Sequence, residues 1–274
     1  MKRIISVVSF FFLLQLFFTI PAVLLSSFGN VMKGMTGRPN VPSTDIDPTI
    51  YACALIAFNI CMIGILMKTR WVNSTIRSWK EIEAKHLLAC IPAVLFGIFV
   101  VNGISELAKL QDNNMELYKS MATSIPGIIT IVILAPICEE LTFRDAIQGY
   151  LHRNGYKAWH CIIASAMLFG IIHLNPAQIP FAFAMGLFLG WLYYRTGSVM
   201  PGIVCHILNN GIAIVSIATS DSDETLIESL GTTNFVIAMI VSTVAFAVLT
   251  FWLNRHFDNH PEITIEENIV PNEE

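Results

Sequence analysis

Long apolar runs recur along the chain and predict membrane-spanning helices. A helix needs about 20 consecutive apolar residues to cross the hydrocarbon core of a bilayer. Runs of that kind cover residues 4–25, 48–67, 87–105, 122–138 and 233–254, and shorter or interrupted runs cover 138–153, 159–174, 179–194 and 199–218. With 122–153 taken as one long helix, the pattern predicts an all-α integral membrane protein with about eight transmembrane helices.

The composition agrees with this pattern and excludes a nucleic-acid-binding role. Hydrophobic residues make up 54% of the 274 residues and charged residues 13%, about half the charged share of a soluble domain. Too few polar side chains are present to cover a water-facing surface, so most of the exterior must face lipid. The formal net charge is −4, which offers no basic surface of the kind that nucleic acid binds.

Charge also predicts how the chain is organised and oriented. Residues 1–257 show no repeat or linker and are expected to form a single multi-pass membrane domain, followed by a polar acidic tail at 258–274. The first apolar run is long and lacks a small-x-small cleavage site, so we expect it to be retained as a span. Lysine and arginine near span ends stay on the cytoplasmic side. Twelve of the 16 basic residues fall on the side of the two termini, which are therefore predicted to be cytoplasmic.

Ionisable residues inside the predicted spans form three clusters, and the first holds two adjacent carboxylates. Such side chains cost a few kcal/mol in a bilayer, so each needs a partner or a function. Glu140 and Arg144 lie four residues apart on one helical face and can pair, whereas Glu139 is rotated by about 100° and stays available. A structural ion pair would explain Glu140 and Arg144, but a second carboxylate adds repulsion, which favours a function for Glu139.

The other two clusters each place a histidine on a helical face. Phe169 and His173 are four residues apart, and His173 has no acidic neighbour in its own segment, so its partner must come from another helix. His206 and Asn210 also share a face, and both can donate hydrogen bonds to one oxyanion. Taken singly, each of these polar residues could instead bond a backbone carbonyl or hold helices together. One common site would explain all three clusters.

Helix geometry predicts that the first two clusters meet. With Gly155 as the turn of an antiparallel hairpin, Glu139 lies sixteen residues before it and His173 eighteen after it. At about 1.5 Å per residue, the two side chains reach nearly the same depth. His206 lies only about nine residues beyond the next turn and is shallower by the same arithmetic. Tilted or broken helices near the prolines of segment 176–201 are expected to make up the difference.

The three clusters, in this order, resemble the motifs of the CAAX protease and bacteriocin-processing enzyme family, the type II CAAX prenyl endopeptidases and their bacterial relatives. The resemblance covers about residues 122–218 and is carried by Glu139-Glu140-x-x-x-Arg144, Phe169-x-x-x-His173 and His206-x-x-x-Asn210. It implies an intramembrane endopeptidase of the glutamate type, with transmembrane helices enclosing a catalytic cavity open to the cytoplasm. Asp145 departs from the family pattern, in which a small residue often follows the arginine.

The resemblance also implies roles and partners. Glu139 with His173 would activate a water molecule, His206 with Asn210 would stabilise the oxyanion, and Glu140, Arg144 and Phe169 would support them. Substrates would be peptides or lipid-anchored proteins of a CAAX-like or bacteriocin-related kind, at a plasma membrane of the bacterial inner-membrane type. A carboxylate in an apolar enclosure is a stronger base toward water than a solvated one, which agrees with the role of Glu139.

Two alternatives stay open at this point. We expect no cofactor, because the chain contains no His-Glu-x-x-His stretch of the helical zinc proteases. A zinc site built from Glu139, His173 and His206 is nevertheless possible from ligand types alone, and would make the protein a zinc-dependent membrane protease. The second alternative is a non-catalytic membrane immunity or binding protein. A transporter is less expected, because transporters often show repeated halves and none is visible here.

Overall fold

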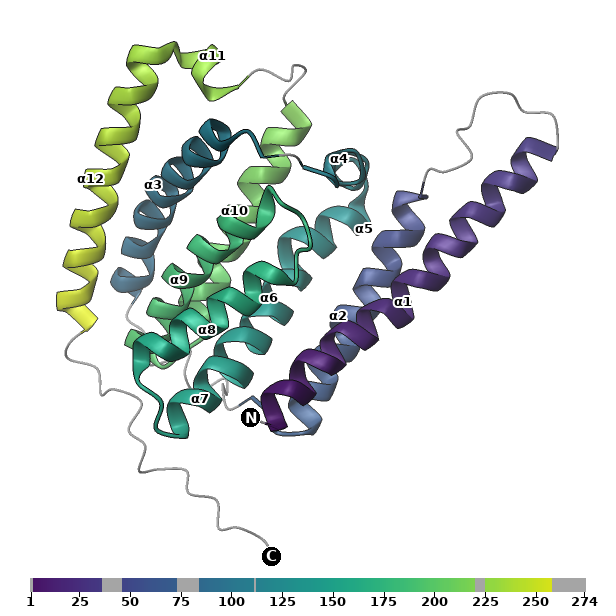
Figure 1. Cartoon of the computed structure of the whole chain (residues 1–274), viewed down its shortest axis with the longest axis horizontal. Coiled ribbons are helices and arrows are strands. Elements are labelled where there is room, and N and C mark those ends of the chain that lie inside the picture. Colours follow the sequence, from purple (N-terminus) through teal and green to yellow (C-terminus); the bar gives the residue numbers. More distant parts are fainter. Residues whose placement is uncertain (1, 36–45, 73–83, 111, 220–224, 258–274) are drawn as a thin grey trace, which may run out of the picture.

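The chain folds into helices only, within the part that the structure describes (Figure 1). The computed structural model describes residues 2–35, 46–72, 84–110, 112–219 and 225–257, so the predicted acidic tail lies outside the described residues. The all-α membrane class expected from the sequence is confirmed. The helices are α1 (Lys2–Met35), α2 (Pro48–Lys68), α3 (Ala84–Ala108), α4 (Met115–Ala122), α5 (Ile125–Ile128), η2 (Ile129–Leu134), α6 (Ala135–Glu139), η3 (Glu140–Gly149), α7 (Tyr150–Arg153), α8 (Ala158–Ile171), α9 (Gln178–Thr196), α10 (Met200–Thr219), α11 (Leu226–Leu230) and α12 (Thr232–Phe257).

Six helical stretches of the described chain are long and apolar enough to cross a membrane. They are Lys2–Asn30, Pro48–Lys68, Leu87–Ala108, Ile125–Arg153, Met200–Thr219 and Thr232–Phe257. The other two expected spans correspond to α8 and α9. Helix α8 has 14 residues, about 21 Å of helix, which is shorter than the hydrocarbon core, and the 19-residue α9 is not among the six. The protein is therefore a multi-pass membrane protein, and the count of eight spans is not confirmed.

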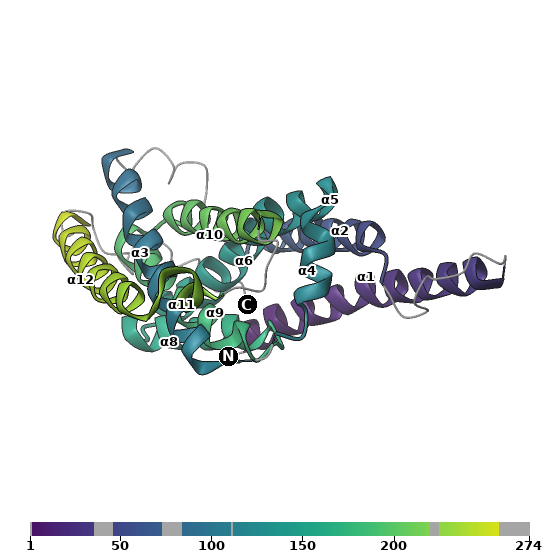
Figure 2. The ribbon, with the colours of Figure 1, turned by 90° about the horizontal axis from the view of Figure 1, so that it is seen from above.

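The helices pack side by side around a central group that carries the candidate site. Helix α1 packs against α2 on one flank, and α12 packs against α3 on the other (Figure 1). Helices α6, α8, α9 and α10 lie between these two pairs (Figures 1 and 2). Large apolar side chains on the outer pairs are exposed, such as Phe17 of α1 and Ile240 of α12. Side chains of this kind suit a surface that faces lipid.

The central helical stretch runs without a break from Ile125 to Arg153 and contains two π-helical segments, η2 and η3. The Ser124 hydroxyl caps its start by accepting a hydrogen bond from the Gly127 amide at 3.1 Å. Gly155 ends the following turn with a φ of +82°, a left-handed conformation that glycine adopts without strain. The chain then reverses into α8, so the predicted hairpin is present. Glu139 and Glu140 stand where α6 passes into η3, and π-helical turns are frequent at functional sites.

Helix α9 and helix α10 meet at a turn whose first residue is exposed and whose following residues are buried. Helix α9 ends at Thr196, and the exposed Gly197 after it has a φ of +65°. Residues 198–203 are all buried, and α10 begins at Met200. Helix α9 runs through Pro180 without interruption because this proline lies in its first turn. The chain is not helical between α8 and α9, so the helix break expected near Pro176 is present.

Candidate active site

A fully buried carboxylate, Glu140, joins the long central helix to α10. Its Oε2 lies 3.1 Å from Nε of Arg144, and both side chains have no exposed surface. Its Oε1 lies 3.1 Å from Nδ1 of His206. The pair with Arg144 follows from the four-residue spacing, whereas the bond to His206 joins positions 66 residues apart. Two donors on one carboxylate compensate its charge, as a buried carboxylate requires.

Glu139 differs from its neighbour because part of its side chain is accessible. The side chain is 17% exposed, and its Oε2 lies 3.7 Å from Nε2 of His206. The imidazole of His206 therefore lies between the two glutamates, with one ring nitrogen toward each. Glu139 also interacts electrostatically with His173. The accessible carboxylate is thus the one that the sequence predicts to be available, and it lies beside the imidazole of His206 and within electrostatic range of the imidazole of His173.

His173 lies in the turn that follows α8. Its Nδ1 is 2.8 Å from the carbonyl oxygen of Phe169. Because a carbonyl can only accept, Nδ1 carries the proton, and Nε2 of the neutral ring is the acceptor. This bond is the one expected for a core histidine, and it also selects the tautomer that a base needs.

Phe169 separates and orients the two imidazoles. Its ring is 1% exposed and lies edge-to-face with His173 at 5.1 Å and with His206 at 5.6 Å between centroids. The guanidinium of Arg144 lies over the same ring at 4.7 Å. Such contacts favour one fixed arrangement of rings and cation. Phe169 therefore brings His173, His206 and Arg144 around one centre.

Asn210 is held by two partners. Its Nδ2 donates to the carbonyl oxygen of Ile131 in η2 at 2.8 Å, and its Oδ1 accepts from Nδ2 of Asn209 at 2.9 Å. The bond to Ile131 joins α10 to the central helix, which agrees with the alternative that Asn210 holds helices together. The amide nitrogen carries a second hydrogen, so a further donor function is compatible with this geometry. The oxyanion role of Asn210 stays a prediction.

Three further residues shape the site and were not found by sequence reasoning. Ser165 of α8 accepts from Nη1 of Arg144 at 3.4 Å and donates to the Phe143 carbonyl at 2.7 Å. Asn209 is 9% exposed and bonds Asn210. Gly202 lies so close to Glu140 that a Cβ there would stand 2.8 Å from Oε2. A serine, an asparagine and a glycine inside apolar helices are common packing residues, so no sequence signal distinguished them.

Asp145 is fully buried and contacts side chains of α7 and α9. Its Oδ1 accepts from the Tyr193 hydroxyl at 3.2 Å and lies 3.5 Å from Nη1 of Arg153. The departure from the family motif is thus accommodated by a polar cluster that joins η3 to α7 and α9.

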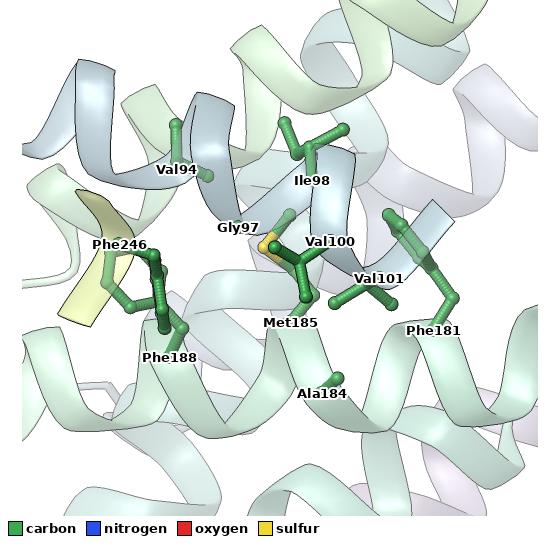
Figure 3. Close-up of a pocket in the computed structure, with 10 residues that line it drawn as sticks. All are labelled: Val94, Gly97, Ile98, Val100, Val101, Phe181, Ala184, Met185, Phe188 and Phe246. Carbon is green, nitrogen blue, oxygen red and sulfur yellow. The ribbon is translucent and has the colours of Figure 1, made fainter. Parts of the chain in front are cut away.

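Two other features bear on what the protein could bind. Among the described side chains, no group of three or more histidine, cysteine, aspartate or glutamate residues is arranged to hold a metal ion. A pocket of about 140 Å³ lies between α3, α9 and α12, and its lining is apolar (Figure 3). None of its lining residues belongs to the three clusters. They are Val94, Gly97, Ile98, Val100, Val101, Phe181, Ala184, Met185, Phe188 and Phe246.

Comparison with known proteins places the whole candidate site inside one family region. The family model described as "Type II CAAX prenyl endopeptidase Rce1-like" matches residues 121–212, which include every residue of the three clusters. The chain is 25% identical over 175 residues to "Putative membrane peptidase YdiL" of Bacillus subtilis (strain 168), a match that covers 59% of this chain and 70% of that protein.

A second relative has a more explicit name. The chain is 32% identical over 108 residues to "Membrane-embedded CAAX protease MroQ" of Staphylococcus aureus (strain USA300), covering 37% of this chain and 44% of that protein. No solved structure matches the chain significantly. The family region, the named relatives and the helical membrane fold agree with one another. Residues 121–212 therefore carry the region of the CAAX protease and bacteriocin-processing enzyme family, and the protein is a membrane peptidase.

Proposed function

We propose that this protein is an intramembrane endopeptidase of the glutamate type that hydrolyses peptide bonds of membrane-associated substrates. The observation that carries the proposal is the difference between the two glutamates. Glu140 is fully buried and bonded to Arg144 and His206, whereas Glu139 is partly exposed and has two imidazoles nearby. An accessible carboxylate beside a histidine of defined tautomer is suited to take a proton from water.

In the proposed reaction, Glu139 accepts one proton from a water molecule as the water oxygen attacks the peptide carbonyl carbon, while Nε2 of His173 accepts a hydrogen bond that orients the same water. The carbonyl double bond opens to an oxyanion, which the second N–H of Asn210 and the Nε2–H of His206 stabilise; because Nδ1 of His206 already donates to Glu140, this step requires the imidazole to carry both of its protons. Losing one such donor costs on the order of 3 kcal/mol in other enzymes. When the C–N bond breaks, the proton passes to the leaving amine. The carboxylate is regenerated without a covalent intermediate.

The substrate class follows from the setting of the site. A site in the helical core of a multi-pass protein meets peptides that are themselves held at the membrane, by a span or by a lipid anchor. The name of the staphylococcal relative includes CAAX protease activity, which supports a CAAX-like substrate. A bacteriocin-related peptide is the other candidate of this class. The distribution of lysine and arginine supports cytoplasmic termini, and the bacterial relatives support a bacterial plasma membrane.

A comparison of membrane proteomes tests the function and identifies the substrate in the same experiment. Membranes from cells that make the wild-type protein are compared with membranes from cells that make Glu139→Gln at the same level. We expect at least one membrane-associated peptide that is shortened at one end in the first sample and intact in the second. Identical terminal peptides in both samples would count against the proposal. Terminal sequencing by mass spectrometry gives the cleaved bond.

The zinc-dependent alternative would use Glu139, His173 and His206 as ligands, and activity measurements separate it from the glutamate mechanism. Cleavage that persists in strong chelators, by protein that contains no metal in elemental analysis, would remove the zinc alternative. Cleavage that is lost with chelator and restored by zinc would replace the glutamate mechanism. The non-catalytic alternative predicts that Glu139→Ala retains the biological effect of the wild-type protein.

Gly202 offers a test of how closely the site must be packed. In Gly202→Ala, the new methyl would lie 2.8 Å from Oε2 of Glu140. Glu140 cannot move away easily, because Arg144 and His206 hold it. We expect kcat to fall on the order of 10-fold to 100-fold, since small displacements at a site have effects of that size. The assay uses the peptide found in the proteome comparison.

Gly211→Ala, on the same helix, is the matched control. Its new methyl would meet only Val132, at an ordinary contact distance of 3.8 Å. We expect its kcat to stay within about 2-fold of the wild type, because alanine is favoured over glycine in a helix. Equal activity of Gly202→Ala and Gly211→Ala would contradict the role given to the close contact at Glu140.

A further inference from the structure

His173 lies in a turn, so the regular backbone hydrogen bonds of a helix do not fix its position. Helix α8 ends at Ile171, and the His173 amide donates to the Gly170 carbonyl oxygen at 3.2 Å. The next residue, Leu174, has a φ of +50°, a left-handed conformation that side chains other than glycine rarely adopt. Contacts from outside the turn must therefore maintain its shape.

Asn175 supplies the buried anchor of this turn. It has no exposed surface. Its carbonyl oxygen accepts from the amides of Gln178 at 3.0 Å and Ile179 at 2.9 Å, where α9 begins. Its Oδ1 accepts from the Ala177 amide at 3.3 Å. These bonds join the turn to α9. They do not involve Nδ2 of Asn175, which is buried and needs a hydrogen-bond acceptor from another segment.

That partner comes from a segment 63 residues earlier in the chain. Nδ2 of Asn175 donates to Oδ1 of Asp112 at 2.7 Å, and the same oxygen accepts from the Asn114 amide at 2.8 Å just before α4. A short bond from an amide to a carboxylate is charge-assisted and stronger than a neutral one. The segment before α4 thus holds the turn that contains His173 through a charge-assisted hydrogen bond to the buried Asn175.

We propose that Asp112, through its hydrogen bond to buried Asn175, is a positioning residue that holds the His173 imidazole beside Glu139. Asp112 does not touch the reacting atoms. The inference rests on the proposed function, because the consequence of a displaced His173 is slower hydrolysis. Its effect should appear in kcat, since the Asp112 carboxylate hydrogen-bonds Asn175 and Asn114 and its role is to position His173.

Single substitutions separate the hydrogen bond from the charge. Asp112→Ala removes the acceptor, and we expect kcat to fall on the order of 10-fold to 100-fold while KM stays within about 2-fold. Asp112→Asn keeps an oxygen that can accept from both Asn175 and Asn114, so we expect near wild-type kcat. Glu116→Gln on α4 is the control for charge loss. Its carboxylate is 94% exposed, and its kcat should equal that of the wild type.

A swapped pair gives the decisive measurement. Asn175→Asp places two carboxylates against each other, and we expect kcat to fall at least as far as in Asp112→Ala. The double variant Asp112→Asn with Asn175→Asp restores an amide facing a carboxylate, with donor and acceptor exchanged. We expect it to recover most of the lost kcat. Unfolding midpoints in detergent micelles are measured for all variants, so that a loss of folded protein is not read as a loss of kcat.

The outcomes separate this inference from the proposed function. If cleavage requires Glu139 but Asp112→Ala keeps the wild-type kcat, the positioning role is wrong and the function stands. The same holds if the double variant is no faster than Asn175→Asp, or if Asp112→Asn is as slow as Asp112→Ala. If cleavage does not depend on Glu139, the proposed function fails, whatever the Asp112 variants do. If Asp112→Ala fails to fold, the comparison of Asn175→Asp with the double variant decides.

Discussion

Replacing Glu139 by glutamine is expected to lower kcat on the order of 1,000-fold while the protein stays folded. Glutamine keeps the shape of the side chain but cannot accept the proton of the attacking water, and loss of a general base commonly costs a factor of this size. The 3.7 Å approach to His206 is not an optimal hydrogen bond, so little stability should depend on the carboxylate charge. Steady-state cleavage of the peptide identified in the membrane proteome measures the effect.

His173→Ala should reduce kcat to a similar level, because Nε2 of this ring is the second group facing the water. Glu116→Gln is again the control, since its carboxylate lies on the surface of α4 away from the site. Normal cleavage by Glu139→Gln would disprove the glutamate mechanism, whatever the result for His173→Ala. Normal cleavage by His173→Ala alone would leave Glu139 as the base and remove the histidine from the reaction.

Replacing Arg144 by methionine is expected to lower the free energy of unfolding by about 3–5 kcal/mol. The change removes the cation from a pair in which neither side chain has exposed surface, and an uncompensated buried charge has a cost of this size. It also removes the guanidinium from above the Phe169 ring. Equilibrium unfolding in mixed detergent micelles, followed by far-ultraviolet circular dichroism, measures the loss.

The double variant Glu140→Gln with Arg144→Met separates charge from packing. It leaves no buried carboxylate without a cation, so we expect it to regain a large part of the stability lost in Arg144→Met. Glu116→Gln is the control, because Glu116 pairs with Lys119 at 4.0 Å on the surface. It should change the free energy of unfolding by less than about 1 kcal/mol. If the double variant is as unstable as Arg144→Met, the loss in the free energy of unfolding comes mainly from packing and not from the unpaired charge.

The sequence by itself determined the features that depend on short-range spacing. Apolar run length predicted a helical membrane protein, because a helix must satisfy its backbone within lipid. The four-residue spacing predicted the pair of Glu140 and Arg144, and Gly155 marked the hairpin turn. Ionisable residues in apolar runs also identified Glu139, His173 and His206 as the residues to examine, since burial of such groups has a high cost.

Contacts between segments far apart in the chain could be known only from the tertiary structure. These include the bridge of His206 between two glutamates, the bond of Asn210 to Ile131, and the link from Asp112 to Asn175. Helical periodicity predicts which side chains share a face of one helix, but not which face of another helix meets it. The placement of His206 beside the two glutamates likewise depended on how α10 packs against the central helix, which residue counting along the chain does not give.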